Sequence, residues 1–254
     1  MKKLAMILLA VGVPLMAQWP NRPTPGVPRT PAGKPDLLAP APRSADGKPD
    51  LSGVWLVRNG GALFYITSDL KPEEIRPWAA ALYKQREDNF RKDTDGIACH
   101  PPGPKAGIAV GNFPMKIVQT PNLVVILYEY QTLFRQIFTD ARELPQDPNP
   151  TWMGYSVGRW DGDTLVIDTL GFNNSSWLDA RGHGHSEEMR VQERFHRRDF
   201  GHLEVTVTVT DPKVFTKPFT INFVEGLLPD TDVFEHVCSE NEKDAGHQPG
   251  RAGR

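Results

Sequence analysis

The sequence has little net charge, few cysteines and none of several familiar enzyme signatures. Its formal net charge is −2 over 254 residues, which gives no electrostatic reason to expect nucleic acid or an anionic membrane as a partner. It contains no phosphate-binding glycine-rich loop, no dinucleotide-binding fingerprint and no CxxC pair. These absences argue against kinases and nicotinamide-dependent enzymes, and leave open a protein that binds or isomerises a small molecule.

Long apolar runs are absent after the N-terminus. Lys2 and Lys3 precede an apolar run over residues 4–13, and small residues follow up to Ala17, which is typical of a secretory signal peptide. The run is too short for a permanent transmembrane helix, which needs about 20 apolar residues. No cysteine for a lipid anchor lies near the cleavage site. We therefore expect residues 1–17 to be removed, and a periplasmic or extracellular protein without stable membrane insertion.

The chain has only two cysteines, Cys99 and Cys238. An even pair in an exported protein favours one disulfide, because the compartment is oxidising. Closing so long a loop contributes roughly 2–4 kcal/mol, mainly by restricting the unfolded chain. Two unpaired thiols are the alternative.

Proline is abundant, with 24 residues, and it gathers in residues 18–43. Such a segment cannot bury enough apolar surface to fold alone, so we expect an extended or disordered leader. "TPAGKPDL" at 30–37 recurs as "SADGKPDL" at 44–51. Only the second copy continues into "SGVW", so we interpret the first as a duplicated lead-in and not as a structural unit.

One helix is predicted, at about residues 72–91. Pro72 and the two glutamates after it suit a first helical turn, and apolar residues then recur at helical spacing. Pro77 lies inside this pattern, so a short turn should precede a regular helix that starts near residue 77.

Short β-type runs separated by turn residues follow position 114. In "HLEVTVTVT" (202–210) apolar and polar residues alternate, and Asp161-Gly162 is a strong hairpin turn. Short turns force antiparallel neighbours, so residues 44–241 are predicted to form a mainly all-β domain, an antiparallel meander closed into a barrel. Two packed sheets are the alternative, and residues 242–254 are expected to form a disordered tail. The β-type runs, including one before position 114, cover residues 50–57, 115–120, 122–130, 132–139, 155–160, 164–172, 190–198, 202–210, 218–226 and 233–238.

Several of these motifs occur in combination: "DGKPDLSGVW", "IVQTPNLVVILYEY", "GRWDGDTLVIDTLGFN" and "VQERFHRRDFGHLEVTVTVTDP". Together they resemble a family of exported, largely uncharacterised bacterial proteins, over roughly residues 44–241. The arrangement is also similar to calycin barrels, the lipocalins and their relatives, at the level of fold only. The resemblance implies a secreted β-barrel and brings no settled reaction with it.

The stretch "GFNNSSWLDARGHGHSEE" (171–188) holds the densest set of titratable residues. His183 or His185 could act as a general base or acid, with Asp179 or Glu187 fixing the tautomer. Two imidazoles and Glu187 would also suit Zn²⁺ or Fe²⁺, although the cupin metal motif is not matched. A polar loop between strands remains open. We expect no cofactor, with Zn or Fe as the alternative.

Aromatic and arginine side chains are the candidate ligand contacts. On a strand, Tyr128 and Tyr130 share one face, and Arg135 could meet Glu129 as an ion pair across the turn. Either face could line the barrel, but charged groups inside a barrel are costly unless paired or placed at a ligand; an outward charged face is the simpler alternative. The remaining candidates are Trp152, Tyr155, Arg159 and Trp177.

The sequence therefore predicts an exported β-barrel that binds a small, mostly apolar or aromatic molecule in its interior. The alternatives are a hydrolase, lyase or isomerase that uses the loop at 177–188, and a scaffold for interactions in the cell envelope.

Overall fold

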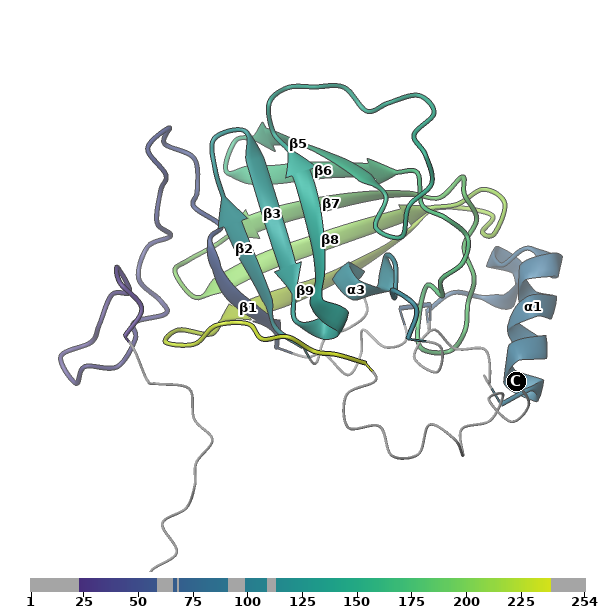
Figure 1. The fold of residues 1–254 in the computed structure, drawn as a ribbon, viewed down its shortest axis with the longest axis horizontal. Coiled ribbons are helices and arrows are strands. Elements are labelled where there is room, and N and C mark those ends of the chain that lie inside the picture. Colours follow the sequence, from purple (N-terminus) through teal and green to yellow (C-terminus); the bar gives the residue numbers. More distant parts are fainter. Residues whose placement is uncertain (1–22, 59–65, 68, 91–98, 109–112, 239–254) are drawn as a thin grey trace, which may run out of the picture.

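The computed structural model describes residues 23–58, 66–67, 69–90, 99–108 and 113–238. Nine strands follow one another around a closed barrel in chain order (Figure 1). The expected signal peptide (1–17) and tail (242–254) lie outside the described residues. The strands are β1 (Gly53–Val57), β2 (Met115–Gln119), β3 (Leu123–Tyr128), β4 (Leu133–Phe138), β5 (Tyr155–Asp161), β6 (Thr164–Leu170), β7 (Arg190–Arg197), β8 (His202–Thr210) and β9 (Phe219–Leu227).

The all-β barrel is confirmed, with one difference in strand direction. β4 and β5 pair in parallel, with Ile137 opposite Ser156 and Phe138 opposite Val157, whereas the other neighbours pair antiparallel. The segment 139–154 between these strands is long enough to return the chain to the end of the barrel where β4 began. The meander is therefore interrupted at one seam, which short hairpin turns could not have produced.

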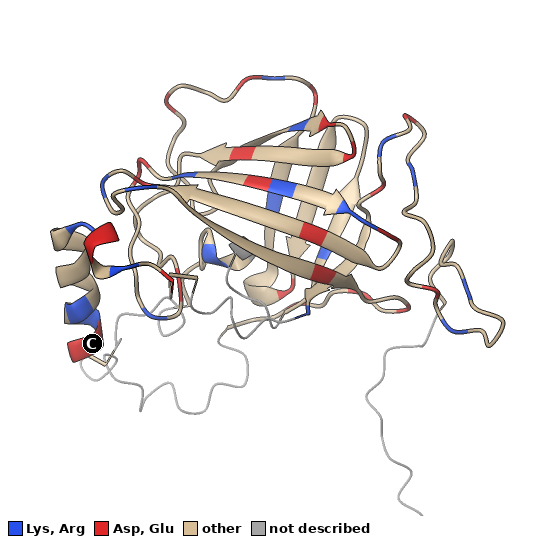
Figure 2. Cartoon of the chain, turned by 180° about the vertical axis from the view of Figure 1, so that it is seen from behind, with Lys and Arg blue, Asp and Glu red and all other residues tan. Residues whose placement is uncertain are grey.

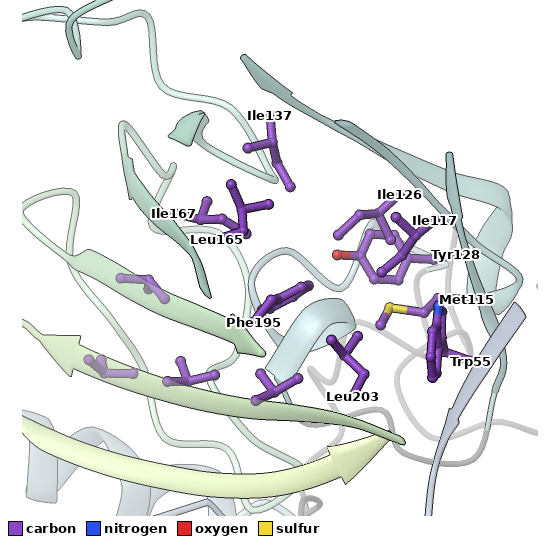
Figure 3. Packing of buried hydrophobic residues seen from close by; sticks show 14 of the residues in the cluster. Trp55, Met115, Ile117, Ile126, Tyr128, Ile137, Leu165, Ile167, Phe195 and Leu203 are labelled. Carbon is purple, nitrogen blue, oxygen red and sulfur yellow. The ribbon is translucent and has the colours of Figure 1, made fainter. Parts of the chain in front are cut away.

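Alternation along the strands separates the inside of the barrel from its outside. On β8 the side chains of Leu203, Val205, Val207 and Val209 are each no more than 2 % exposed, while the threonines between them are half-buried. Figure 3 shows such inward side chains from several strands meeting in one core. Charged residues of both signs are interspersed along the strands in Figure 2, and ion pairs form between strands, such as that of Arg194 on β7 with Asp161 on β5, at 2.9 Å.

The predicted helix is present and starts late. A short 3₁₀ turn, η2 (Pro72–Glu74), comes first, and helix α1 (Pro77–Asp88) follows, because Pro77 suits a first helical turn and not a helix interior. α1 lies beside one end of the barrel, opposite the N-terminal leader (Figure 1). A second short helix, α3 (Lys105–Ile108), was not predicted. None of the helices in the described ranges is long and apolar enough to cross a membrane.

The leader is attached to the barrel. Its backbone carbonyls at Leu37 and Ala39 accept hydrogen bonds from Gly201 and Phe200, in the turn between β7 and β8, at 2.8 and 2.7 Å. Both copies of the repeat also fold alike, since Thr30 and Ser44 each donate a backbone hydrogen bond to the lysine four positions later. The first copy is therefore a structural unit, contrary to our interpretation of the sequence.

The disulfide between Cys99 and Cys238 is confirmed, with Cα atoms 5.7 Å apart. The strand expected at 233–238 is wrong, because this segment is irregular. It is held by other contacts: the backbone N–H of Phe234 donates to Glu129 Oε2 at 3.1 Å, and the His236 ring lies against Tyr130 and Phe113.

Candidate functional site

A polar cluster lies inside the barrel, among apolar side chains. Arg135 on β4 forms an ion pair with Glu193 on β7, and its Nη1 lies 3.0 Å from Glu193 Oε1. Its Nε donates to Ser156 Oγ at 2.9 Å, and its Nη2 donates to Thr169 Oγ1 at 2.7 Å. Burial opposes the charge on Arg135, but Glu193 outweighs it and raises the arginine pKa. Arg135 therefore keeps its charge, and its hydrogen bonds are largely satisfied within the barrel.

The expected partner of Arg135 is wrong. The sequence analysis placed Glu129 beside it, but Glu129 lies in the turn after β3 and accepts the Phe234 N–H. Arg135 points inward and not toward solvent, as its 7 % exposure shows. Glu193 was missed, although its place between Val191 and Phe195 in an alternating apolar register is a readable signal.

Glu225 on β9 is a second buried acid in the same interior, and it was also missed. It is 4 % exposed, and its Oε2 has no hydrogen-bond partner within the residues that the structure describes. Burial raises its pKa from 4.5 to about 8, so the carboxyl group keeps its proton at neutral pH. Such a group can donate a hydrogen bond, and an unsatisfied one is costly in an apolar interior.

Tyr128 lies in the same interior. Its ring lies in the core and its hydroxyl oxygen is directed into the interior (Figure 3). Burial raises the pKa of this hydroxyl to about 12; Arg135 opposes the shift, and the charges of Glu193 and Glu225 add to it. Tyr128 therefore keeps its proton and adds a neutral hydroxyl group to this interior. Groups with perturbed pKa values that gather in one interior are a recognised mark of functional sites.

Ser156 belongs to a G-x-S-x-G match, "GYSVG" at 154–158, that our reading of the sequence missed. In α/β-hydrolases the serine of this motif stands on a turn between a strand and a helix. Here Ser156 lies within β5, 1 % exposed, and its hydroxyl bonds Arg135 and Thr169. The motif does not form a nucleophile turn in this fold.

The histidine loop, residues 171–188, connects β6 to β7 at the end of the barrel near α1. Both carboxylate oxygens of Asp179 lie 3.0 Å from His183 Nδ1, and Thr67 Oγ1 donates to the same carboxylate at 2.5 Å. Although burial favours the protonated acid, the hydrogen bonds from His183 and Thr67 keep the pKa of Asp179 below its usual value. An ionised Asp179 accepts a hydrogen bond from Nδ1–H of His183, and the imidazole tautomer with that proton carries its lone pair on Nε2.

His183 is held tightly in this orientation. Its ring stacks on Tyr83 of α1 with 4.2 Å between centroids, and it is 7 % exposed. Nε2 makes no hydrogen bond to any described residue, since the contacts of the ring all run through Nδ1. An aspartate that orients a histidine with a free Nε2 is the arrangement of a general base.

His185 and Glu187 do not join this pair. His185 Nε2 lies 2.9 Å from Ser176 Oγ, its Nδ1 lies 3.3 Å from the Ser186 carbonyl, and Glu187 is exposed. In the part of the chain that the structure describes, no group of three His, Cys, Asp or Glu residues is placed to hold a metal ion. The two histidines thus have separate surroundings.

The other candidate ligand contacts lie outside the barrel interior. Tyr155 and Arg159 are on the face of β5 opposite Ser156, where Tyr155 stacks on Phe138 and Arg159 pairs with Asp168. Trp177 is buried in the histidine loop below the Arg86 guanidinium. Tyr130 packs in the turn after β3 and Trp152 lies near His100. Of the seven candidates, Tyr128 and Arg135 face the interior.

No family model, curated protein or solved structure matches this chain.

Proposed function

We propose that the protein binds a small, uncharged, mostly apolar molecule inside the barrel, through a hydrogen bond from Glu225. The observation that carries the proposal is the buried carboxyl group of Glu225, which has no partner at Oε2 among the described residues. A protonated carboxyl needs an acceptor, such as a carbonyl or ether oxygen. Arg135 is already neutralised by Glu193, so this arginine would not select an anionic ligand.

The apolar side chains near Glu225 determine the chemistry of the remainder of the ligand. The side chains on the same face of β9 are Phe219, Ile221 and Phe223, and opposite Glu225 on β8 lies Leu203. Each further apolar contact contributes binding free energy by burying surface, at about 25 cal/mol per Å². The single hydrogen bond determines the orientation of the ligand. This division is usual in small-molecule sites.

The test uses a fluorescent naphthyl ketone, 6-propionyl-2-(dimethylamino)naphthalene, whose carbonyl accepts hydrogen bonds. We expect saturable binding with a shifted emission maximum at pH 6.5, and binding at least tenfold weaker at pH 9.5, where Glu225 is ionised. Glu225→Gln keeps a donor and should bind at both pH values, whereas Glu225→Leu should bind weakly at both. Binding that is unchanged by pH and by both substitutions would falsify the proposal.

Glu204 provides the matched control. It lies on β8 on the outward face, one strand from Glu225, and pairs with Arg198 at 3.0 Å. Glu204→Gln makes the same chemical change at the surface and should leave binding of the ketone and its pH dependence unaltered.

A second function, acid–base catalysis, is favoured by the Asp179–His183 pair. We propose that Nε2 of His183 accepts a proton from a bound substrate. The probe is 5-nitrobenzisoxazole: a base removes its ring C–H proton, the N–O bond breaks, and a coloured cyanophenolate forms. We expect a rate above that of free imidazole, lost in His183→Ala and in Asp179→Asn, and unchanged in His185→Ala. A rate that survives both of the first two substitutions contradicts the assignment.

Export is also part of the proposed function. The disulfide between Cys99 and Cys238 supports an oxidising compartment. Expression of the full chain in a bacterium should yield, in the periplasm or medium, a product whose mass corresponds to cleavage near Ala17. A product of uncleaved mass in the cytoplasm contradicts this assignment.

A further inference from the structure

A cavity of about 700 Å³ lies between the leader and the end of the barrel that it covers. The start of the leader, Pro23–Val27, forms one side, and the beginning of β1 with residues 227–232 forms the other. The wall is rich in apolar side chains, among them Pro25, Val27, Val54, Phe200, Leu227 and Pro229. Its volume lies in the range of small-molecule sites, about 300–1,000 Å³.

We propose that this cavity is a second binding site, for a small, uncharged, ring-containing molecule, and that the leader is its closing strap. The site goes beyond the proposed function, because its wall shares no residue with the polar cluster inside the barrel. Leu227, which lines the cavity, lies on the same face of β9 as Glu225 but two residues further along, at the end of the strand.

The charged groups of the wall indicate an uncharged ligand. Lys116 pairs with Asp232 at 2.9 Å, and Asp230 pairs with Arg29 of the leader at 2.6 Å. Arg197 donates to the backbone carbonyls of Asp50 and Phe200. A charged ligand would have to break one of these pairs and lose its own hydration, both of which cost free energy.

The side chains that form the wall indicate that the ligand contains a ring. Four prolines, Pro23, Pro25, Pro42 and Pro229, line the cavity together with the Phe200 side chain. The proline rings are rigid and apolar, and they lose almost no side-chain entropy when a ligand packs against them. A planar ligand would bury apolar area on both of its faces there.

The start of the strap is held by hydrogen bonds to Asp230. The Thr24 N–H donates to Asp230 Oδ1 at 2.6 Å, and the Asp230 N–H donates back to Thr24 Oγ1 at 2.8 Å. Arg29 bonds the same Oδ1. Two of these three hydrogen bonds use the Asp230 carboxylate, the third uses its backbone N–H, and all of them join the leader to the segment after β9. Loss of this side chain should free the near wall of the cavity and leave the barrel intact.

A second leader contact provides a matched control. Arg43 makes a bidentate ion pair with Asp163, at 2.9 and 2.6 Å, beside the β5–β6 turn. Neither residue is part of the cavity wall. Asp230→Ala and Asp163→Ala thus each remove one leader–barrel ion pair, and only the first should open the cavity.

The experiment is a fluorescence titration of the full chain with N-phenyl-1-naphthylamine, which is neutral, and with anilinonaphthalene sulfonate, which is anionic. We expect saturable uptake of the neutral probe and at least tenfold weaker uptake of the anionic one. Asp230→Ala should weaken binding of the neutral probe at least tenfold, and Val27→Trp, which fills the cavity, should abolish it. Asp163→Ala and the interior variant Glu225→Leu should stay within twofold of wild type.

Circular dichroism and the urea midpoint establish that each variant is folded. The proposal is overturned if the wild type takes up no neutral probe, if the anionic probe binds as tightly, or if Asp230→Ala and Val27→Trp bind as the wild type does. Uptake that is lost in Glu225→Leu and kept in Asp230→Ala assigns the probe to the barrel interior, which supports the proposed function and overturns the second site.

Discussion

Arg135 of β4 and Glu193 of β7 form an ion pair across the inside of the barrel, with Nη1 3.0 Å from Oε1. The same guanidinium also bonds Ser156 of β5 and Thr169 of β6. Only two residue pairs define the register of the parallel seam between β4 and β5. Arg135 therefore connects β4 to the three strands beyond that seam, and the buried polar cluster closes the barrel where backbone pairing is shortest.

Arg135→Met should destabilise the protein strongly. It leaves the carboxylate of Glu193 buried without its cation, and breaking such a pair typically costs about 3–5 kcal/mol of unfolding free energy. The double variant Arg135→Met, Glu193→Leu removes both charges and should recover most of the loss. Urea unfolding with the disulfide intact measures both. A double variant no more stable than the single one contradicts the argument.

Glu225→Gln should change how stability depends on pH. The carboxyl binds its proton more tightly in the folded chain, with a pKa of about 8, than at its ordinary value of 4.5. Its contribution to stability is therefore full below pH 4.5, falls as the pH rises toward 8, and is level above that. At about 1.4 kcal/mol per pH unit the loss amounts to several kcal/mol.

The glutamine variant lacks this proton, so its unfolding free energy should fall much less than that of the wild type between pH 5 and pH 9. Urea unfolding at pH 5, 7 and 9 is the measurement, with Glu204→Gln as the surface control. Parallel curves for wild type and Glu225→Gln would show that the acid is not buried as described.

The two repeat turns allow a comparison between matched glycines. Gly33 and Gly47 have φ of +76° and +80°, and a Cβ at either meets no atom within 4 Å. The substitution by alanine therefore costs only the free energy of holding a residue with a Cβ in the left-handed conformation, about 1–2 kcal/mol. We expect Gly47→Ala to lower the global unfolding free energy by that amount, because this turn leads into Leu51, which is 0 % exposed.

Gly33→Ala should change the global value by less than about 0.5 kcal/mol, since its turn lies in the leader and its strain is relieved by local opening. Hydrogen exchange should show that opening at the Thr30 amide. Equal global losses in the two variants would mean that both turns unfold together with the barrel.

Removal of the disulfide should lower stability without removing the fold. The bond joins residues 139 positions apart, and a cross-link of that span contributes about 2–4 kcal/mol by restricting the unfolded chain. The double variant Cys99→Ser, Cys238→Ser should lose that amount in urea, with the barrel circular dichroism retained. An unchanged midpoint contradicts the expectation.

Local pattern was enough to predict the barrel. Alternation in "HLEVTVTVT" and the Asp161-Gly162 turn depend on side-chain direction and on neighbouring residues, so they act the same way in any context. The Asp179–His183 pair was also within reach, because the two residues are four positions apart. Glu193 and Glu225 could have been found as charged residues in apolar registers, since each continues the inward face of its strand.

The pairing between distant residues was decided only by the tertiary structure. The partner of Arg135 is 58 residues away, the parallel seam depends on the path of segment 139–154, and the leader is held by Asp230, 206 residues from Thr24. The sequence by itself determined which side of each strand faces inward, because that follows from a period of two residues. Which inward groups meet, and which acid remains without a partner, depends on how the barrel closes, and no local pattern encodes that closure.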